Sequence, residues 1–108
     1  MKRAISMLSI AVFLTVMAAQ AASTASTGWI SDSMCGAKHV HGTNADVACV
    51  TKCVQSGLKP VFVDTKKQIW TIDNPDAVKS FYGEHVKVTA TEDAANKSVH
   101  IESITAAK

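Results

Sequence analysis

The clearest alternation of hydrophobic and polar residues lies in the C-terminal third of the chain. Within Glu84–Thr91, Val86, Val88 and Ala90 alternate with polar residues. A period of two is typical of a strand that has one face in a core. Ser98–Ile104 alternates in the same way and predicts the last strand of the domain.

Three other segments with high β-propensity precede these two strands. Gly28–Met34 predicts a first strand, although Asp32 interrupts its apolar face. Pro60–Val63 and Gln68–Ile72 are rich in β-branched and aromatic residues, which favour strands. The polar residues between these two runs predict that they form a hairpin.

A helical pattern separates the first strand from this hairpin. Thr43–Asp46 offers a capping side chain and an early acidic residue, and Gly57 provides a C-terminal stop. Three valines spaced for one helix face predict the buried stripe. They are Val47, Val50 and Val54. Cys49 and Cys53 lie along one edge of that stripe, one turn apart, so we expect both thiols to face the same way.

A second, shorter helix is predicted between the third and fourth strands. Asn74-Pro75 provides a cap followed by proline at the first helical position, and Gly83 closes the segment. The complete order predicts a mainly β (α+β) fold. This order of strands and helices is typical of a small five-stranded OB-like barrel, here with an inserted cysteine-bearing helix and a short helix before the fourth strand. An open α+β sheet is the alternative.

The N-terminus has the three parts of a secretory signal peptide. Lys2 and Arg3 provide the positive region, Ile5–Ala18 the apolar region, and Ala19-Gln20-Ala21 a small-residue cleavage site. The apolar run is shorter than the roughly 20 residues that a spanning helix needs. Because the first cysteine is Cys35, the chain lacks the cysteine that a lipoprotein carries directly after this segment.

Cleavage at this site divides the chain into three parts. We expect a signal peptide over residues 1–21, a flexible leader over 22–27, and a single domain over 28–105. The mature protein is therefore predicted to be periplasmic or extracellular. It is expected to have no membrane attachment after cleavage, and to be a monomer.

Charge argues against nucleic acid as a partner. The full chain has 11 Lys plus Arg and 9 Asp plus Glu, but removal of Lys2 and Arg3 leaves the mature protein near neutrality and without arginine. The remaining lysines are spread along the chain. Since nucleic-acid binding needs a clustered basic face, we expect none, and the partner is predicted to be an unidentified protein or small ligand.

Four motifs together resemble a small family of exported bacterial domains of unknown function with OB-fold-like character. They are Gly28–Gly36 (G-W-I-S-D-S-M-C-G), Cys49–Cys53 (C-V-T-K-C), Lys59–Val63 and His85–Thr89. The resemblance covers most of the mature chain. It implies export and an OB-like fold, and it implies no activity.

Three cysteines in an oxidising compartment cannot all pair within one chain. Cys49 and Cys53 stand at i and i+4 of the predicted helix, so joining them to each other would distort it. Either of them is a possible disulfide partner for Cys35. Such a bridge would contribute about 3 kcal/mol to a domain of this size, but it leaves one thiol without a role.

A metal site is the second explanation of the same residues. Cys35, Cys49 and Cys53 with His39 or His41 would provide four ligands for zinc, and copper(I) would accept the three sulfurs with or without Met34. No cofactor other than zinc or copper is indicated. The spacing matches no standard zinc finger.

Catalytic motifs are missing from the sequence. It contains no nucleophile-elbow Gly-x-Ser-x-Gly, no phosphate-binding glycine loop and no CxxC pair. No catalytic or cofactor-binding residue is therefore assigned. The sequence predicts an exported, non-enzymatic domain that is stabilised by its Cys/His cluster or binds through it, and a small periplasmic thiol-redox protein is the alternative.

Overall fold

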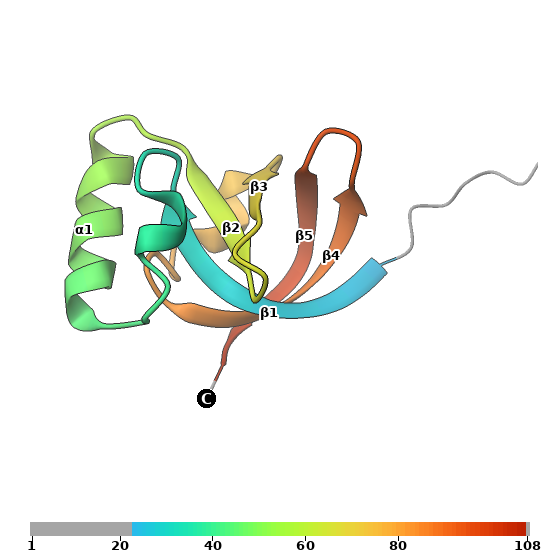
Figure 1. Cartoon of the computed structure of the whole chain (residues 1–108), viewed down its shortest axis with the longest axis horizontal. Coiled ribbons are helices and arrows are strands. Elements are labelled where there is room, and N and C mark those ends of the chain that lie inside the picture. The colour runs from blue at the N-terminus through green and yellow to red at the C-terminus, as the bar shows by residue number, and fades with distance from the viewer. Residues whose placement is uncertain (1–22, 108) are drawn as a thin grey trace, which may run out of the picture.

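The computed structural model describes residues 23–107, and this part of the chain is mainly β (Figure 1). Its elements, in chain order, are β1 (Ser23–Asp32), the 3-10 helix η1 (Gly36–Lys38), α1 (Asn44–Gln55), β2 (Pro60–Asp64), β3 (Ile69–Ile72), the 3-10 helix η2 (Pro75–Val78), β4 (His85–Asp93) and β5 (Ser98–Ala106). The predicted signal peptide, 1–21, lies outside the described residues. Between 23 and 107, no helix is both long and apolar enough to cross a membrane.

The five strands form one mixed sheet with the neighbour order β1-β2-β3-β5-β4. Because β1 pairs with both β2 and β4, the sheet closes on itself. All pairs are antiparallel except β3 and β5, where Thr71 stands opposite Ser98 and Ile72 opposite Val99. The predicted hairpin is confirmed, with Phe62 of β2 opposite Trp70 of β3.

The first strand is longer than its hydrophobic pattern indicates. The flexible leader expected over 22–27 is wrong for its described part: residues 23–27 form the first half of β1 and pair with β4, from Ser23 opposite Thr91 to Thr27 opposite Lys87. Backbone pairing satisfies the peptide groups of this segment although its small polar side chains bury little. The Ser23 hydroxyl also donates to the exposed Glu102 carboxylate across β4.

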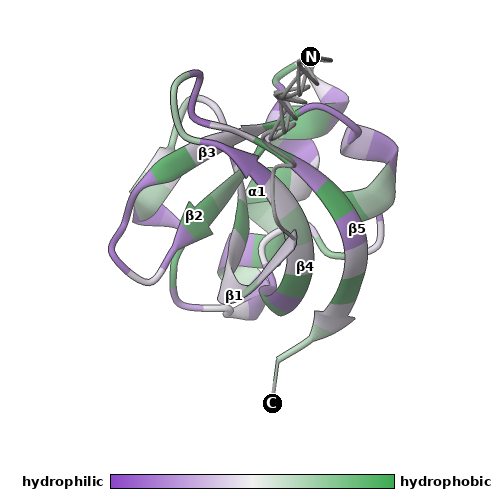
Figure 2. Ribbon diagram, turned by 90° about the vertical axis from the view of Figure 1, so that its right-hand side faces the viewer, coloured by the Kyte–Doolittle hydropathy of each residue, from purple (hydrophilic) through white to green (hydrophobic). Residues whose placement is uncertain are grey.

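The core lies inside the closed sheet and follows the predicted alternation. Val86, Val88 and Ala90 of β4 are all buried, and hydrophobic and hydrophilic residues alternate along β4 and β5 in Figure 2. Ile30, Phe62, Trp70, Ile72, Val78, Val99 and Ile101 complete this cluster. Burial of side chains of this size provides the main driving force for folding.

The second predicted helix is reduced to the single 3-10 turn η2. Its bonds run three residues back, as in the Ala77 N–H to Asn74 carbonyl bond of 3.0 Å. The chain then turns away, and Gly83, with φ of 77°, donates its N–H to the Ile30 carbonyl at 2.7 Å. Through this bond the segment before Gly83 lies against β1 instead of continuing as a helix.

Candidate metal centre

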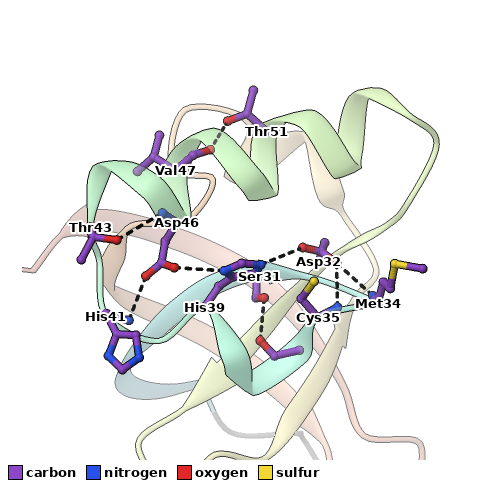
Figure 3. A network of polar contacts seen from close by, with 11 residues as sticks. Ser31, Asp32, Met34, Cys35, His39, His41, Thr43, Asp46, Val47 and Thr51 are labelled. Carbon is purple, nitrogen blue, oxygen red and sulfur yellow. Dashed lines mark hydrogen bonds and ion pairs between the residues drawn. The ribbon is translucent and has the colours of Figure 1, made fainter.

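The last residue of β1, Asp32, is fully buried. Its Oδ1 accepts the backbone N–H groups of Met34 at 3.0 Å and Cys35 at 2.8 Å, which turns the chain from β1 towards η1 (Figure 3). Its Oδ2 is inaccessible to solvent and has no hydrogen-bond partner. A buried carboxylate oxygen without a partner is costly and needs an explanation.

His39 lies just after η1 and also has a buried polar atom without a hydrogen-bond partner. Its Nε2 is also buried and without a hydrogen-bond partner, and it lies 3.9 Å from Asp32 Oδ2. That distance is too long for a hydrogen bond. The second ring nitrogen, Nδ1, lies 3.0 Å from Asp46 Oδ1. An ionised carboxylate only accepts, so Nδ1 carries a proton, and in the neutral ring the Nε2 lone pair then faces Asp32.

Asp46 is held in place by the start of α1. Its N–H donates to the capping Thr43 Oγ1 at 3.2 Å, and its Oδ2 accepts the backbone N–H of His41 at 3.2 Å. Burial opposes ionisation of Asp46, but the hydrogen bonds from His39, His41 and Thr43 outweigh it and lower the pKa of this carboxyl. Asp46 is therefore an anion that orients the His39 ring.

Cys35 completes the group. One ligand atom each from Asp32, Cys35 and His39 lie within 4.8 Å of one another. Two ligands of one tetrahedral zinc ion, each about 2.0–2.3 Å from it, stand about 3.3–3.8 Å apart, so movements of about 1 Å would close this set around one ion. Burial, then the nearby Asp32 carboxylate, raise the pKa of the Cys35 thiol, so it is protonated without a metal and would lose that proton on binding one.

The structure brings together two of the five predicted ligands, Cys35 and His39. His41 is exposed, and its ring points away from the group in Figure 3, so its contribution is the backbone N–H to Asp46. Cys49 and Cys53 are half-buried on α1 and do not belong to the group of three donors. All three cysteines are free thiols, so neither of the two disulfides considered from the sequence is present among the described residues.

Sequence reasoning missed Asp32 and Asp46. Asp32 shares strand parity with the buried Ile30, so its inward direction was readable, but a lone aspartate in an apolar face indicates only an interruption of that face. Asp46 is predicted as a helix-start residue, and it does lie in the first turn of α1. Its second role depends on the loop from Cys35 to Thr43, for which the sequence offers no periodic signal.

Oxygen, sulfur and nitrogen donors in one partly buried group suit a borderline transition-metal ion such as Zn²⁺. A surface hollow of about 360 Å³ lies elsewhere, lined by residues that include Asp73, Glu92 and His100, and none of the three donors contributes to it. No family model, curated protein or solved structure matches the chain. The geometry of the site is therefore what indicates a function.

Proposed function

We propose that this protein is an exported, non-enzymatic module that binds a transition-metal ion through Asp32, Cys35 and His39. The observation that carries the proposal is the pair of buried atoms, Asp32 Oδ2 and His39 Nε2, which face each other without hydrogen-bond partners. A metal ion between them would satisfy both atoms at once. The predicted signal peptide and the motif resemblance support the export part of the proposal.

The main competing explanation is an ion pair without metal, in which a protonated His39 lies between Asp32 and Asp46. It explains the Asp46 contact of 3.0 Å but not the gap of 3.9 Å to Asp32, where a protonated Nε2 would be expected to close to hydrogen-bond distance. It also gives no role to Cys35. Metal binding accounts for all three side chains.

A thiol-based function has one observation in its favour. Cys35, His39 and Asp46 are arranged in the order of a nucleophile, a base and a residue that orients the base. A reactive cysteine, however, needs a lowered pKa, and here burial and Asp32 raise the pKa of Cys35. The acidic neighbour favours a metal ligand over a nucleophile.

The fold supports the architectural part of the proposal. The neighbour order β1-β2-β3-β5-β4, with a helical turn between β3 and β4, is consistent with the OB-like barrel expected from the sequence. In that arrangement α1, which carries Cys49 and Cys53, is an insertion between β1 and β2. It supplies the Asp46 contact that orients His39.

Zinc titration of the exported, metal-free protein tests the proposal. We expect binding of one ion with an increase in melting temperature, since a ligand of the folded state stabilises it. Asp32→Asn, Cys35→Ser and His39→Gln should each weaken binding. His100→Gln is the matched control, because His100 Nδ1 also contacts a carboxylate, Asp73, at 2.7 Å, but on the exposed surface.

Two results would count against the proposal. The first is a wild-type protein that binds neither zinc nor cobalt. The second is equal loss of binding in His39→Gln and His100→Gln, which would indicate unspecific surface histidine binding. If metal binding is missing and Cys35 reacts rapidly with a thiol reagent in a His39-dependent manner, the thiol-based function is the correct one.

A further inference from the structure

The charges of the three donors restrict the kind of cation that the site can hold. Asp32 supplies one negative charge, and Cys35 supplies a second once its thiol proton has left to solvent. His39 binds as a neutral ring, because its Nδ1 proton is held by Asp46. A divalent ion makes this group of ligands electrically neutral.

Because Asp32 is buried, the net charge of the ion and its ligands affects binding strongly. Asp32 is 0 % exposed, and uncompensated charge in such a place is strongly unfavourable. A monovalent ion such as Cu(I) would leave one net negative charge among the three ligands. The Asp46 anion lies directly behind His39 and makes a net negative charge among the ligands still less favourable. Its own charge is partly compensated, because it accepts hydrogen bonds and lies in the first turn of α1.

Of the three cysteines, only Cys35 belongs to the group of donors, although Cys49 and Cys53 lie close enough to Cys35 for their charges to interact. Cys49 and Cys53 stand one turn apart on α1, outside the group of three donor atoms that lie within 4.8 Å of one another. A Cu(I) ion would be expected to select sulfur and so to need at least two of the three cysteines. The arrangement around Asp32 instead brings one sulfur together with an oxygen and a nitrogen.

We infer that the centre takes a divalent cation of the zinc class through a single thiolate, Cys35, together with Asp32 and His39, and leaves Cys49 and Cys53 outside the ligand set. This inference rests on the proposed function. It adds that the ion is divalent rather than monovalent and that Cys49 and Cys53 are not ligands. With three protein ligands, a four-coordinate ion keeps one position for water or another small ligand.

Cobalt(II) is the probe that counts thiolates, because each cobalt–thiolate bond adds to a charge-transfer absorption that zinc lacks. The exported protein loaded with one Co²⁺ should show the intensity of one thiolate. Cys35→Ser should abolish this band, whereas Cys49→Ser, Cys53→Ser and the double variant should retain both the band and the affinity. In the zinc-loaded protein, alkylation followed by mass measurement should modify Cys49 and Cys53 and spare Cys35.

Each alternative outcome has a definite meaning. A band of two or three thiolates, or loss of Co²⁺ on Cys49→Ser, would overturn the inference and leave metal binding at the site intact. Uptake of Cu(I) but not Co²⁺ or Zn²⁺, still dependent on Asp32 and His39, would overturn the divalent assignment alone. Cu(I) uptake that is insensitive to Asp32→Asn and His39→Gln, without divalent binding, would contradict the proposed function itself.

Discussion

The contact between Asp46 and His39 determines which ring nitrogen is available to a metal. Asp46 accepts from His39 through Oδ1 and from the His41 backbone through Oδ2, so its two oxygens are used in different directions. Such carboxylate–histidine pairs fix both the tautomer and the orientation of a metal-binding ring. Asp46 is thus a positioning residue, which acts on the ion only through His39.

Asp46→Asn should change the tautomer of the His39 ring more than it changes the fold. An amide that still accepts from His41 with its oxygen presents NH₂ to His39 Nδ1, and this favours the Nε2–H tautomer, which cannot bind a metal through Nε2. We expect zinc affinity to fall by about 10–100-fold. Nitrogen-15 NMR of the metal-free protein should show the proton moving from Nδ1 to Nε2, a readout that a purely structural role would not change.

The control for this variant is Asp73→Asn at the exposed contact with His100. It should change neither the His39 tautomer nor zinc affinity. If Asp46→Asn leaves the His39 tautomer as in the wild type, Asp46 does not position the ring. This conclusion holds whether or not the protein binds zinc.

At the residue scale, the sequence predicted those donors that belong to residue types common among metal ligands. Cysteine and histidine near one another suggest a metal, and Cys35 and His39 do lie together. Asp32 could not be assigned in the same way, because aspartate is common at strand ends and turns for reasons unrelated to binding. Its role is visible only once burial of both oxygens, and the missing partner of one, are known.

At the element scale, Gly83 controls how closely the start of α1 approaches the sheet. A Cβ atom at Gly83 would lie 2.5 Å from the Val47 N and Cα atoms and 2.6 Å from the Asp46 carbonyl carbon. These are backbone atoms, so they cannot move away without shifting the helix. Gly83 therefore contributes indirectly to the position of the Asp46 carboxylate.

Gly83→Ala is expected to lower the free energy of unfolding by about 2 kcal/mol or more, since it combines a positive φ with a backbone clash. It should also weaken zinc binding by moving Asp46. Gly57→Ala is the matched control: its φ is 102°, but no atom lies within 4 Å of the position that a Cβ would take there, so only the backbone strain remains. Urea denaturation and zinc titration of both variants provide the comparison.

Gly57→Ala should lose less stability than Gly83→Ala and keep the wild-type zinc affinity. Equal losses of stability in the two variants would show that the clash with α1 is relieved without cost. Unchanged zinc binding in Gly83→Ala would show that the position of Asp46 does not depend on this contact.

For the whole molecule, the hydrophobic pattern predicted the number and order of the strands well. Its limit is visible in β1, where Ile30 carries a periodic signal and residues 23–27 carry none. Their pairing with β4 is made by backbone groups, which every sequence possesses, and so leaves no trace in hydropathy. The parallel contact of β3 with β5, which brings distant segments together, was unreadable for the same reason.

Shortening β1 tests whether this backbone pairing contributes to stability. A chain that begins at Gly28 loses the pairs of residues 23–27 with β4 and the Ser23–Glu102 hydrogen bonds, and it exposes one edge of β4. With about 1 kcal/mol for a typical net hydrogen bond, and some compensation by water, we expect a loss of about 1–3 kcal/mol relative to a chain that begins at Ser23. Urea denaturation measures this difference.

Hydrogen exchange locates the effect, because the amides of β4 that face residues 23–27 should lose protection while those of β2 keep it. Zinc affinity should stay unchanged in the folded shortened chain, since Asp32 lies at the opposite end of β1 and its turn to Cys35 is intact. Identical urea midpoints for the two chains would mean that the pairing adds no stability, and residues 23–27 would then behave in solution as the leader that their composition predicts.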